Sequence, residues 1–161
     1  MNSLKIAYDA VRNGDVSVVD SILRMEPSLA NAQTPFGTLL HVAAAEGNEG
    51  ILNALLDSGA EVNALGGTFG GTALNQAAAS GKLEAVRLLL SRGAKIDTSE
   101  PERNPLFGAI YASSIEIAKL LIDSGIDISI AYTGNSMKGM DAKAFAIERG
   151  ENKIANLLHS Q

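Results

Sequence analysis

The chain contains no cysteine among its 161 residues. A disulfide scaffold, a thiol nucleophile and a zinc–thiolate site are therefore excluded. Histidine is also scarce: only His41 and His159 occur, and neither has a carboxylate or hydroxyl partner at a spacing typical of catalysis. No metal-ligand spacing is present either. The sequence thus predicts no catalytic residue, no metal site and no cofactor.

Long apolar runs are missing as well. Charged residues interrupt the first twenty positions, from Lys5 to Asp20, so this segment resembles neither a signal peptide nor a transit peptide. Two uncharged stretches, 27–45 and 62–81, are broken by proline or glycine and are unsuited to crossing a membrane. With 46% hydrophobic and 19% charged residues, the composition is that of a folded domain. We expect a soluble, cytoplasmic protein.

Basic residues are absent from one long segment. The chain has 13 basic and 18 acidic residues and a net charge of −5, which argues against general affinity for nucleic acid or anionic membranes. Between Met25 and Gly81 there is no Lys or Arg, whereas five acidic residues lie there. This segment forms either a solvated acidic face or a surface that attracts a basic partner.

What the sequence does contain is a repeat. Five similar segments end in alanine at spacings of 33, 34, 32 and 37 residues, namely at Ala10, Ala43, Ala77, Ala109 and Ala146. Four residues later stands a glycine or, once, Ser113. A second segment follows with apolar residues at i, i+3 and i+4, which predicts a helix with one buried stripe. Because one unit of about 33 residues cannot bury both of its helices alone, neighbouring units must stack.

These units resemble the ankyrin family over almost the whole chain. The resemblance rests on Thr38-Leu-Leu-His41, Thr72-Ala-Leu-Asn75 and Asn104-Pro-Leu-Phe107, against Thr-Pro-Leu-His in the family, and on the phrases Gly59-Ala-Glu-Val-Asn63 and Gly93-Ala-Lys-Ile-Asp97. It implies an all-α solenoid of about five stacked helix-turn-helix units, with projecting loop or hairpin fingers and a concave face. It also implies that His41 links neighbouring loops by hydrogen bonds. We place the units at about 1–33, 34–66, 67–99, 100–132 and 133–161, with the first and last acting as caps.

One finger is longer than its neighbours and rich in glycine. It runs nine residues from Asn63 to Thr72, and it lacks the Gly-Lys-Ser/Thr ending of a phosphate loop. Phe69 lies among four glycines, where no local core can easily bury it. Its ring is either an exposed anchor for a partner or folds back on its own unit. Thr68 beside it and Phe36 in the preceding finger also belong to the finger tips.

Four further residues stand out against the repeat. Tyr132 and Met137 lie in the longest connection, which either contributes to a binding face or closes the core as an elaborated cap. Gly108 lies inside a first helix, where we expect it to permit close packing with the neighbouring unit. By resemblance, Tyr111 points onto the concave face together with Glu46.

An extended repeat surface without reactive groups at catalytic spacing favours a protein-binding module over an enzyme. We therefore expect a non-enzymatic protein, monomeric on its own, that binds another protein and neither nucleic acid nor membrane. An inhibitor or immunity protein of a toxin is one form of this function, because the last unit resembles small bacterial ankyrin proteins, some of which are immunity proteins. A generic intracellular scaffold or regulatory subunit is the alternative, and an enzyme the remote one. The expected partner-binding residues are Phe36, Glu46, Thr68, Phe69, Tyr111 and Tyr132.

Overall fold

The computed structural model describes residues 2–67, 69–134 and 137–159. Within these residues the chain forms five successive pairs of α-helices, as the repeat predicts. The pairs are α1 (Ser3–Asn13) with α2 (Val16–Met25), α3 (Leu39–Glu46) with α4 (Glu49–Asp57), α5 (Ala73–Ala79) with α6 (Leu83–Ser91), α7 (Pro105–Tyr111) with α8 (Ile115–Asp123), and α9 (Ala142–Glu148) with α10 (Asn152–Leu157).

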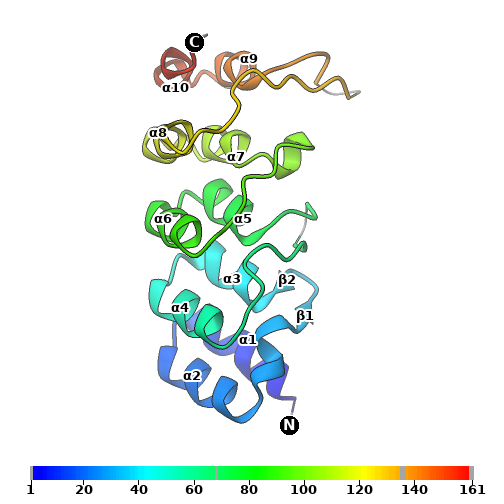
Figure 1. Ribbon diagram of the computed structural model, residues 1–161, viewed down its shortest axis with the longest axis vertical. Helices are drawn as coiled ribbons and strands as arrows, with labels where there is room; N and C mark the ends of the chain where they lie inside the picture. The colour runs from blue at the N-terminus through cyan, green and yellow to red at the C-terminus, as the bar shows by residue number, and fades with distance from the viewer. Residues whose placement is uncertain (1, 68, 135–136, 160–161) are drawn as a thin grey trace.

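The helix pairs stack along the long axis of the molecule (Figure 1). The first helices form one row, the second helices a parallel row, and the connecting fingers project on the side of the first row. The finger between α2 and α3 begins with a 3-10 turn, η1 (Pro27–Asn31), and then holds a short antiparallel ribbon, β1 (Gln33–Thr34) with β2 (Gly37–Thr38). The finger between α6 and α7 contains a second 3-10 turn, η2 (Pro101–Arg103). The predicted all-α solenoid is confirmed.

Local sequence sets where the helices begin and end. In α3 and α5 the first residue after the finger is a threonine, and its hydroxyl and the side chain three residues later form a capping box, Thr38 with His41 and Thr72 with Asn75. The turn inside a pair needs a left-handed residue, which glycine supplies at no steric cost, as at Gly47 with φ 78°. Ser113 takes the same place with φ 56°.

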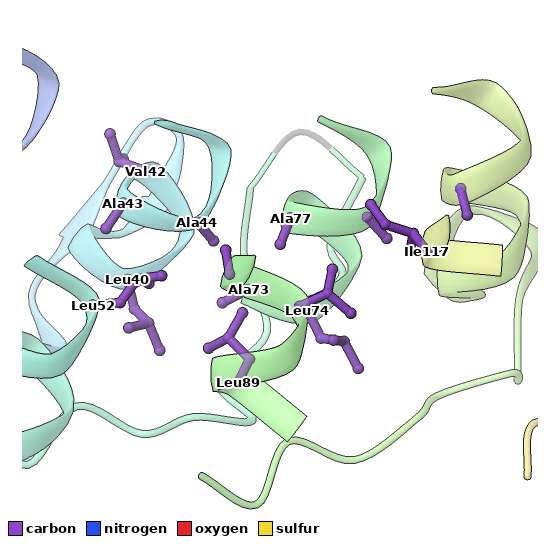
Figure 2. Close-up of a cluster of buried hydrophobic side chains, with 14 of the residues drawn as sticks. Leu40, Val42, Ala43, Ala44, Leu52, Ala73, Leu74, Ala77, Leu89 and Ile117 are labelled. Atoms are coloured by element: carbon purple, nitrogen blue, oxygen red, sulfur yellow. The ribbon is translucent and has the colours of Figure 1, made fainter. Parts of the chain in front are cut away.

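One continuous hydrophobic core follows the stack (Figure 2). Paired aliphatic side chains of the second helices, such as Leu52 and Leu89, are completely buried. Small residues stand where first helices approach each other, with Ala44 and Ala73 between α3 and α5. Small side chains let the similar backbones of neighbouring units approach closely, and large side chains fill the space that remains between them.

Asparagine side chains join the fingers of the first three units. Asn31 Nδ2 donates to the carbonyl of Gly59 at 2.8 Å, and Asn31 Oδ1 accepts from the Glu61 amide at 2.8 Å. Asn63 repeats this with Gly93 and Lys95, one unit further along. An amide side chain suits this position because it donates and accepts at once.

The series ends at Asp97, the next equivalent position. Its carboxylate accepts from the Ser99 amide in its own loop at 2.9 Å. Hydrogen bonds from Ser99 hold the pKa of Asp97 below its usual value, so the side chain is ionised at neutral pH. An ionised carboxylate has no proton to donate to the next finger's carbonyl. The fourth unit is therefore attached without this bridge.

Candidate protein-binding surface

His41 is a structural residue. It is buried, and its Nε2–H donates to the Gly71 carbonyl of the next finger at 3.1 Å. Because a carbonyl only accepts, the proton lies on Nε2 and the unprotonated Nδ1 accepts from the Thr38 amide at 3.1 Å. Burial lowers the pKa of His41 and so favours this neutral form. Both ring nitrogens are used, as the resemblance implied.

The prediction that Tyr132 offers its ring to a partner is wrong. The residue is 8% exposed, and its hydroxyl donates to the Thr98 carbonyl at 2.8 Å while accepting from Asn104 Nδ2 at 3.0 Å. Its ring meets Phe107 edge-on, with centroids 5.3 Å apart. Burial raises the pKa of the Tyr132 hydroxyl, partly offset by the Asn104 bond. The long last connection thus supplies a residue that closes the core.

Tyr132 also forms a bridge between helix pairs, although from a position that the earlier units do not use. His41 bonds to a group 30 residues along the chain, and Asn75 Nδ2 donates to the Arg103 carbonyl 28 residues along. Asn104 and Tyr132 are also 28 residues apart. Asn104, however, stands at the position of Thr38 and Thr72, three residues before that of His41 and Asn75. The tyrosine bridge is therefore a departure from the series, which the repeat pattern did not signal.

Phe69 and Tyr111 remain exposed, at 66% and 63%, and both line one open groove of about 310 Å³. We call it the aromatic groove. It combines fingers and first helices of the last three units, and its lining residues are Phe69, Ala79, Pro101, Glu102, Phe107, Gly108, Tyr111, Met137 and Phe145. The lining is mostly apolar, although it lies on the surface.

Small residues make room for the groove between the aromatic ones. A Cβ atom added at Gly108 would lie 3.0 Å from the Ala79 amide nitrogen, so Gly108 allows α7 to approach α5 closely. This confirms the packing role expected for Gly108. Because glycine has no side chain, position 108 also leaves room in the aromatic groove, which Phe69 and Tyr111 line as well.

Sequence reasoning missed part of the groove. Phe107 occupies the position of His41 and Asn75, and its ring stacks on Phe145 with centroids 4.9 Å apart. The guanidinium of Arg149 lies 4.7 Å from the centre of the Tyr111 ring, which holds that ring at the groove edge by a cation–π contact. The departure at Phe107 was visible in the repeat alignment, whereas the contact with Arg149 depends on how the last two units stack.

Phe36 and Glu46 lie at the other end of the concave face. They line a shallow hollow together with Tyr8, on which Phe36 stacks at a centroid distance of 6.1 Å. A further hollow connects this one to the aromatic groove. It shares Gln76 with the hollow at Phe36, and it shares Phe69 and Gly108 with the groove. The predicted residues Phe36, Glu46, Phe69 and Tyr111 therefore lie on one continuous surface, whereas Thr68 lies outside the described residues.

The acidic segment is partly neutralised by residues from other units. Glu46 pairs with Arg12 of α1 at 2.9 Å, and Asp57 pairs with Arg92 after α6 at 2.6 Å. Both pairs are well exposed and so contribute little stability. They do reduce the negative potential, because two of the five carboxylates in residues 25–81 each have a cation beside them.

Within the described part of the chain, no group of three or more His, Asp or Glu side chains is placed to hold a metal ion. Nor does any described helix combine the length and hydrophobicity that crossing a bilayer requires.

A model of ankyrin repeats, three copies long, matches residues 7–100 and 40–132. The overlapping matches span more than half of the chain, which therefore belongs to the ankyrin repeat family. Ankyrin repeats bind other proteins, and the family is typically non-enzymatic. A search of curated proteins finds no match to this chain.

Proposed function

We propose that this chain binds a partner protein on its concave face, with the aromatic groove as the main anchor point. The observation that carries the proposal is the convergence of Phe69 and Tyr111 on one apolar groove while both rings stay exposed. Large aromatic side chains in contact with small residues and a shaped hollow are the usual energetic centre of a protein interface.

The size of the groove limits what it accepts. About 310 Å³ holds one or two large apolar side chains, and the exposed rings of Phe69 and Tyr111 form part of the lining. Arg149 keeps Tyr111 in place, which lowers the entropy lost when a partner binds. We therefore expect a partner segment with one protruding aromatic or aliphatic side chain to occupy the groove.

The charge of the partner is a finer part of the proposal. The carboxylates of residues 25–81 favour a partner with a basic surface, which is one of the two interpretations that the sequence left open for this segment. Because Arg12 and Arg92 pair with two of them, the long-range attraction should be weaker than the sequence alone indicates. Apolar contact in the aromatic groove, rather than charge, should then dominate the affinity.

The specific role is either that of a one-to-one inhibitor, of which an immunity protein for a toxin enzyme is one form, or that of a scaffold or regulatory subunit. An inhibitor that covers an active site with a rigid concave surface abolishes its partner's activity at equimolar ratio. A scaffold leaves that activity unchanged. Assaying a captured partner with and without this chain separates the two roles.

The test is capture from the native host with the tagged chain, followed by surface-plasmon kinetics on the identified partner. We expect Phe69→Ala and Tyr111→Ala each to weaken binding at least about tenfold, mainly through faster dissociation. Leu65→Ala is a matched control, because Leu65 is half exposed in the same finger but does not line the groove. Glu46→Lys should mainly slow association.

Thermal melts should be unchanged for all four variants, because the substituted side chains are exposed. Equal binding by the parent and both aromatic variants would show that the partner uses another surface. A loss as large in Leu65→Ala as in the two aromatic variants would remove the special role of the groove.

A further inference from the structure

The aromatic groove has side chains of opposite charge at its two ends. Glu102 of η2 lines the groove just before α7 begins, and Tyr111 lines it as the last residue of α7. Arg149 follows α9, the neighbour of α7 in the row of first helices (Figure 1), and its guanidinium lies over the Tyr111 ring. Since the seven residues of α7 are about 10 Å long, a carboxylate and a guanidinium mark opposite ends of the groove.

The finger end of the groove is negative. Glu102 is the charged member of the lining. Burial is the main cause that raises the pKa of the Tyr132 hydroxyl, and the negative charges of three carboxylates, Asp97, Glu100 and Glu102, add to this shift. All three therefore act close to Tyr132, whose ring contacts Phe107 in the groove lining. Their summed field favours a cation at this end of the groove.

The helix end of the groove is positive. The Arg149 guanidinium lies 4.7 Å from the centre of the Tyr111 ring and 5.7 Å from that of the Phe145 ring. A guanidinium on an aromatic face keeps the N–H groups at its edge available as donors. The carboxylate of Glu151, two residues further on, accepts from the Ser113 hydroxyl. Arg149 is exposed, so its N–H groups can receive a carboxylate from a partner.

A partner that fills the aromatic groove must also satisfy both charged ends. Among the described residues, neither Glu102 nor Arg149 takes part in a salt bridge. A partner that covers the groove displaces water from both side chains, and this costs free energy unless each gains an opposite charge or a hydrogen bond. A partner with like charges at these places is rejected, so the two ends contribute specificity.

We propose that the aromatic groove selects an extended partner segment with a basic residue on one side of its apolar anchor and an acidic residue on the other. Alternate side chains of an extended segment point the same way, at about 3.3 Å per residue. Charged residues two positions before and two positions after the anchor are then about 13 Å apart, which suits a groove of about 10 Å. This inference rests on the proposed function, because it names the segment that the groove binds.

Affinity selection from a displayed library of random peptides tests the proposal. Peptides of about twelve residues are long enough to cross the groove when extended. The parent chain should enrich peptides with one basic and one acidic residue around an apolar one. Glu102→Lys makes both ends positive and should enrich acidic residues on both sides, whereas Arg149→Glu makes both ends negative and should enrich basic residues on both sides. Glu100→Lys is the matched control, because Glu100 is exposed in the same finger but does not line the groove.

Fluorescence anisotropy with synthetic peptides from the parent selection measures the size of the effect. Glu102→Lys and Arg149→Glu should each weaken binding about threefold to tenfold, and by less at high salt. Arg149→Lys keeps both the charge and a cation near the Tyr111 ring, so it should bind within about twofold of the parent. Phe69→Ala and Tyr111→Ala should weaken binding at least about tenfold. Circular dichroism melts check that the variants fold, which is expected because these side chains are exposed.

Peptides that depend on Phe69 and Tyr111 but carry no such pair of charges would overturn this proposal and leave the proposed function standing. So would the same charges in the peptides selected by the parent, Glu102→Lys and Arg149→Glu. Peptides that bind Phe69→Ala and Tyr111→Ala as well as the parent would place the contact elsewhere and also overturn it. If the parent enriches no peptide, the extended segment is wrong, and capture of the partner protein decides the proposed function separately.

Discussion

The two halves of the stack are held together by different chemistry. Between the first three units, Asn31, His41 and Asn63 each bridge to a backbone group of the next finger. Between the last two units the bridge is a tyrosine hydroxyl, and the rings of Phe107 and Phe145 stack beside it. The joint between the third and fourth units is intermediate, because Asn75 bonds to the Arg103 carbonyl whereas Asp97 turns back on its own loop.

The comparison shows where a repeat acquires a binding surface. In the regular half the family residues satisfy the finger backbones, and the exposed aromatic rings, Phe36 and Phe69, lie in the fingers rather than on the helices. In the C-terminal half Phe107 replaces the bridging residue, and its ring both fills the joint and lines the aromatic groove. The departures from the family pattern and the candidate binding site thus coincide.

The largest effect should follow from damage at the centre of the stack. Leu89 is completely buried in α6, between the two halves. Leu89→Ala should lower the free energy of unfolding by about 2–5 kcal/mol, because it removes buried methyl groups and leaves a cavity. Since repeats support only their neighbours, the two halves should also unfold less cooperatively. Chemical denaturation monitored by circular dichroism measures both effects, and an unchanged midpoint would contradict the burial of Leu89.

The contact of Tyr132 with Asn104, Thr98 and Phe107, which we call the aromatic joint, can be weakened by removing one hydroxyl oxygen. Tyr132→Phe keeps the ring against Phe107 but leaves the Asn104 amide and the Thr98 carbonyl without their partner. We expect a loss of about 1–3 kcal/mol, with faster amide hydrogen exchange in α9 and α10 than in α1 and α2. A melting curve identical to that of the parent would mean that the hydroxyl bonds do not hold the joint.

The contact between units that His41 makes with the Gly71 carbonyl, which we call the polar joint, should make the stability of the protein depend on pH. Burial lowers the pKa of His41 in the folded protein below the value of about 6.5 for an unfolded histidine. The unfolded state therefore binds more protons than the folded state as the pH falls through 6.5, so stability should decrease from about pH 7 to pH 5. His41→Asn, which copies Asn75, should flatten this dependence in thermal melts. The same slope in parent and variant would assign the pH effect to other groups.

The smallest effect concerns the intermediate joint. Asp97→Asn gives the side chain the donor that Asn31 and Asn63 use, and so makes a bridge to the next finger possible. The substitution also removes the carboxylate charge, and this weakens the hydrogen bonds that Ser99 donates to the side chain of residue 97. We expect a net stabilisation of no more than about 1 kcal/mol, measured by denaturant unfolding. Asn63→Asp is the reverse change and should destabilise the regular joint.

The sequence predicted the features that recur in each unit. The positions of the turns and the buried stripe with Leu89 follow from a periodic pattern. They could be predicted because helix boundaries and buried faces depend on nearby residues and on a neighbour with the same pattern. The bridging role of His41 came from the resemblance to the ankyrin family, and the packing role of Gly108 from a glycine that lies inside a helix. Phe69 stood out because its glycine-rich finger cannot easily bury it locally, although the sequence left open whether the ring folds back on its own unit. Tyr111 was placed on the concave face by the resemblance to the ankyrin family.

Only the tertiary structure decided the features that depend on one particular pair of units. Spacing alone left Tyr132 open between a binding face and a core. Its burial results from contacts with Asn104 and Phe107, which lie at the start of α7 and about 28 and 25 positions earlier in the chain. The pairing of Glu46 with Arg12, and the convergence of Phe69, Tyr111 and Phe145 on one groove, likewise join residues about 30 or more positions apart. The sequence determines each unit through local, repeated interactions. The contacts between unlike units depend on the stacking geometry, because only stacking brings those side chains within reach of one another.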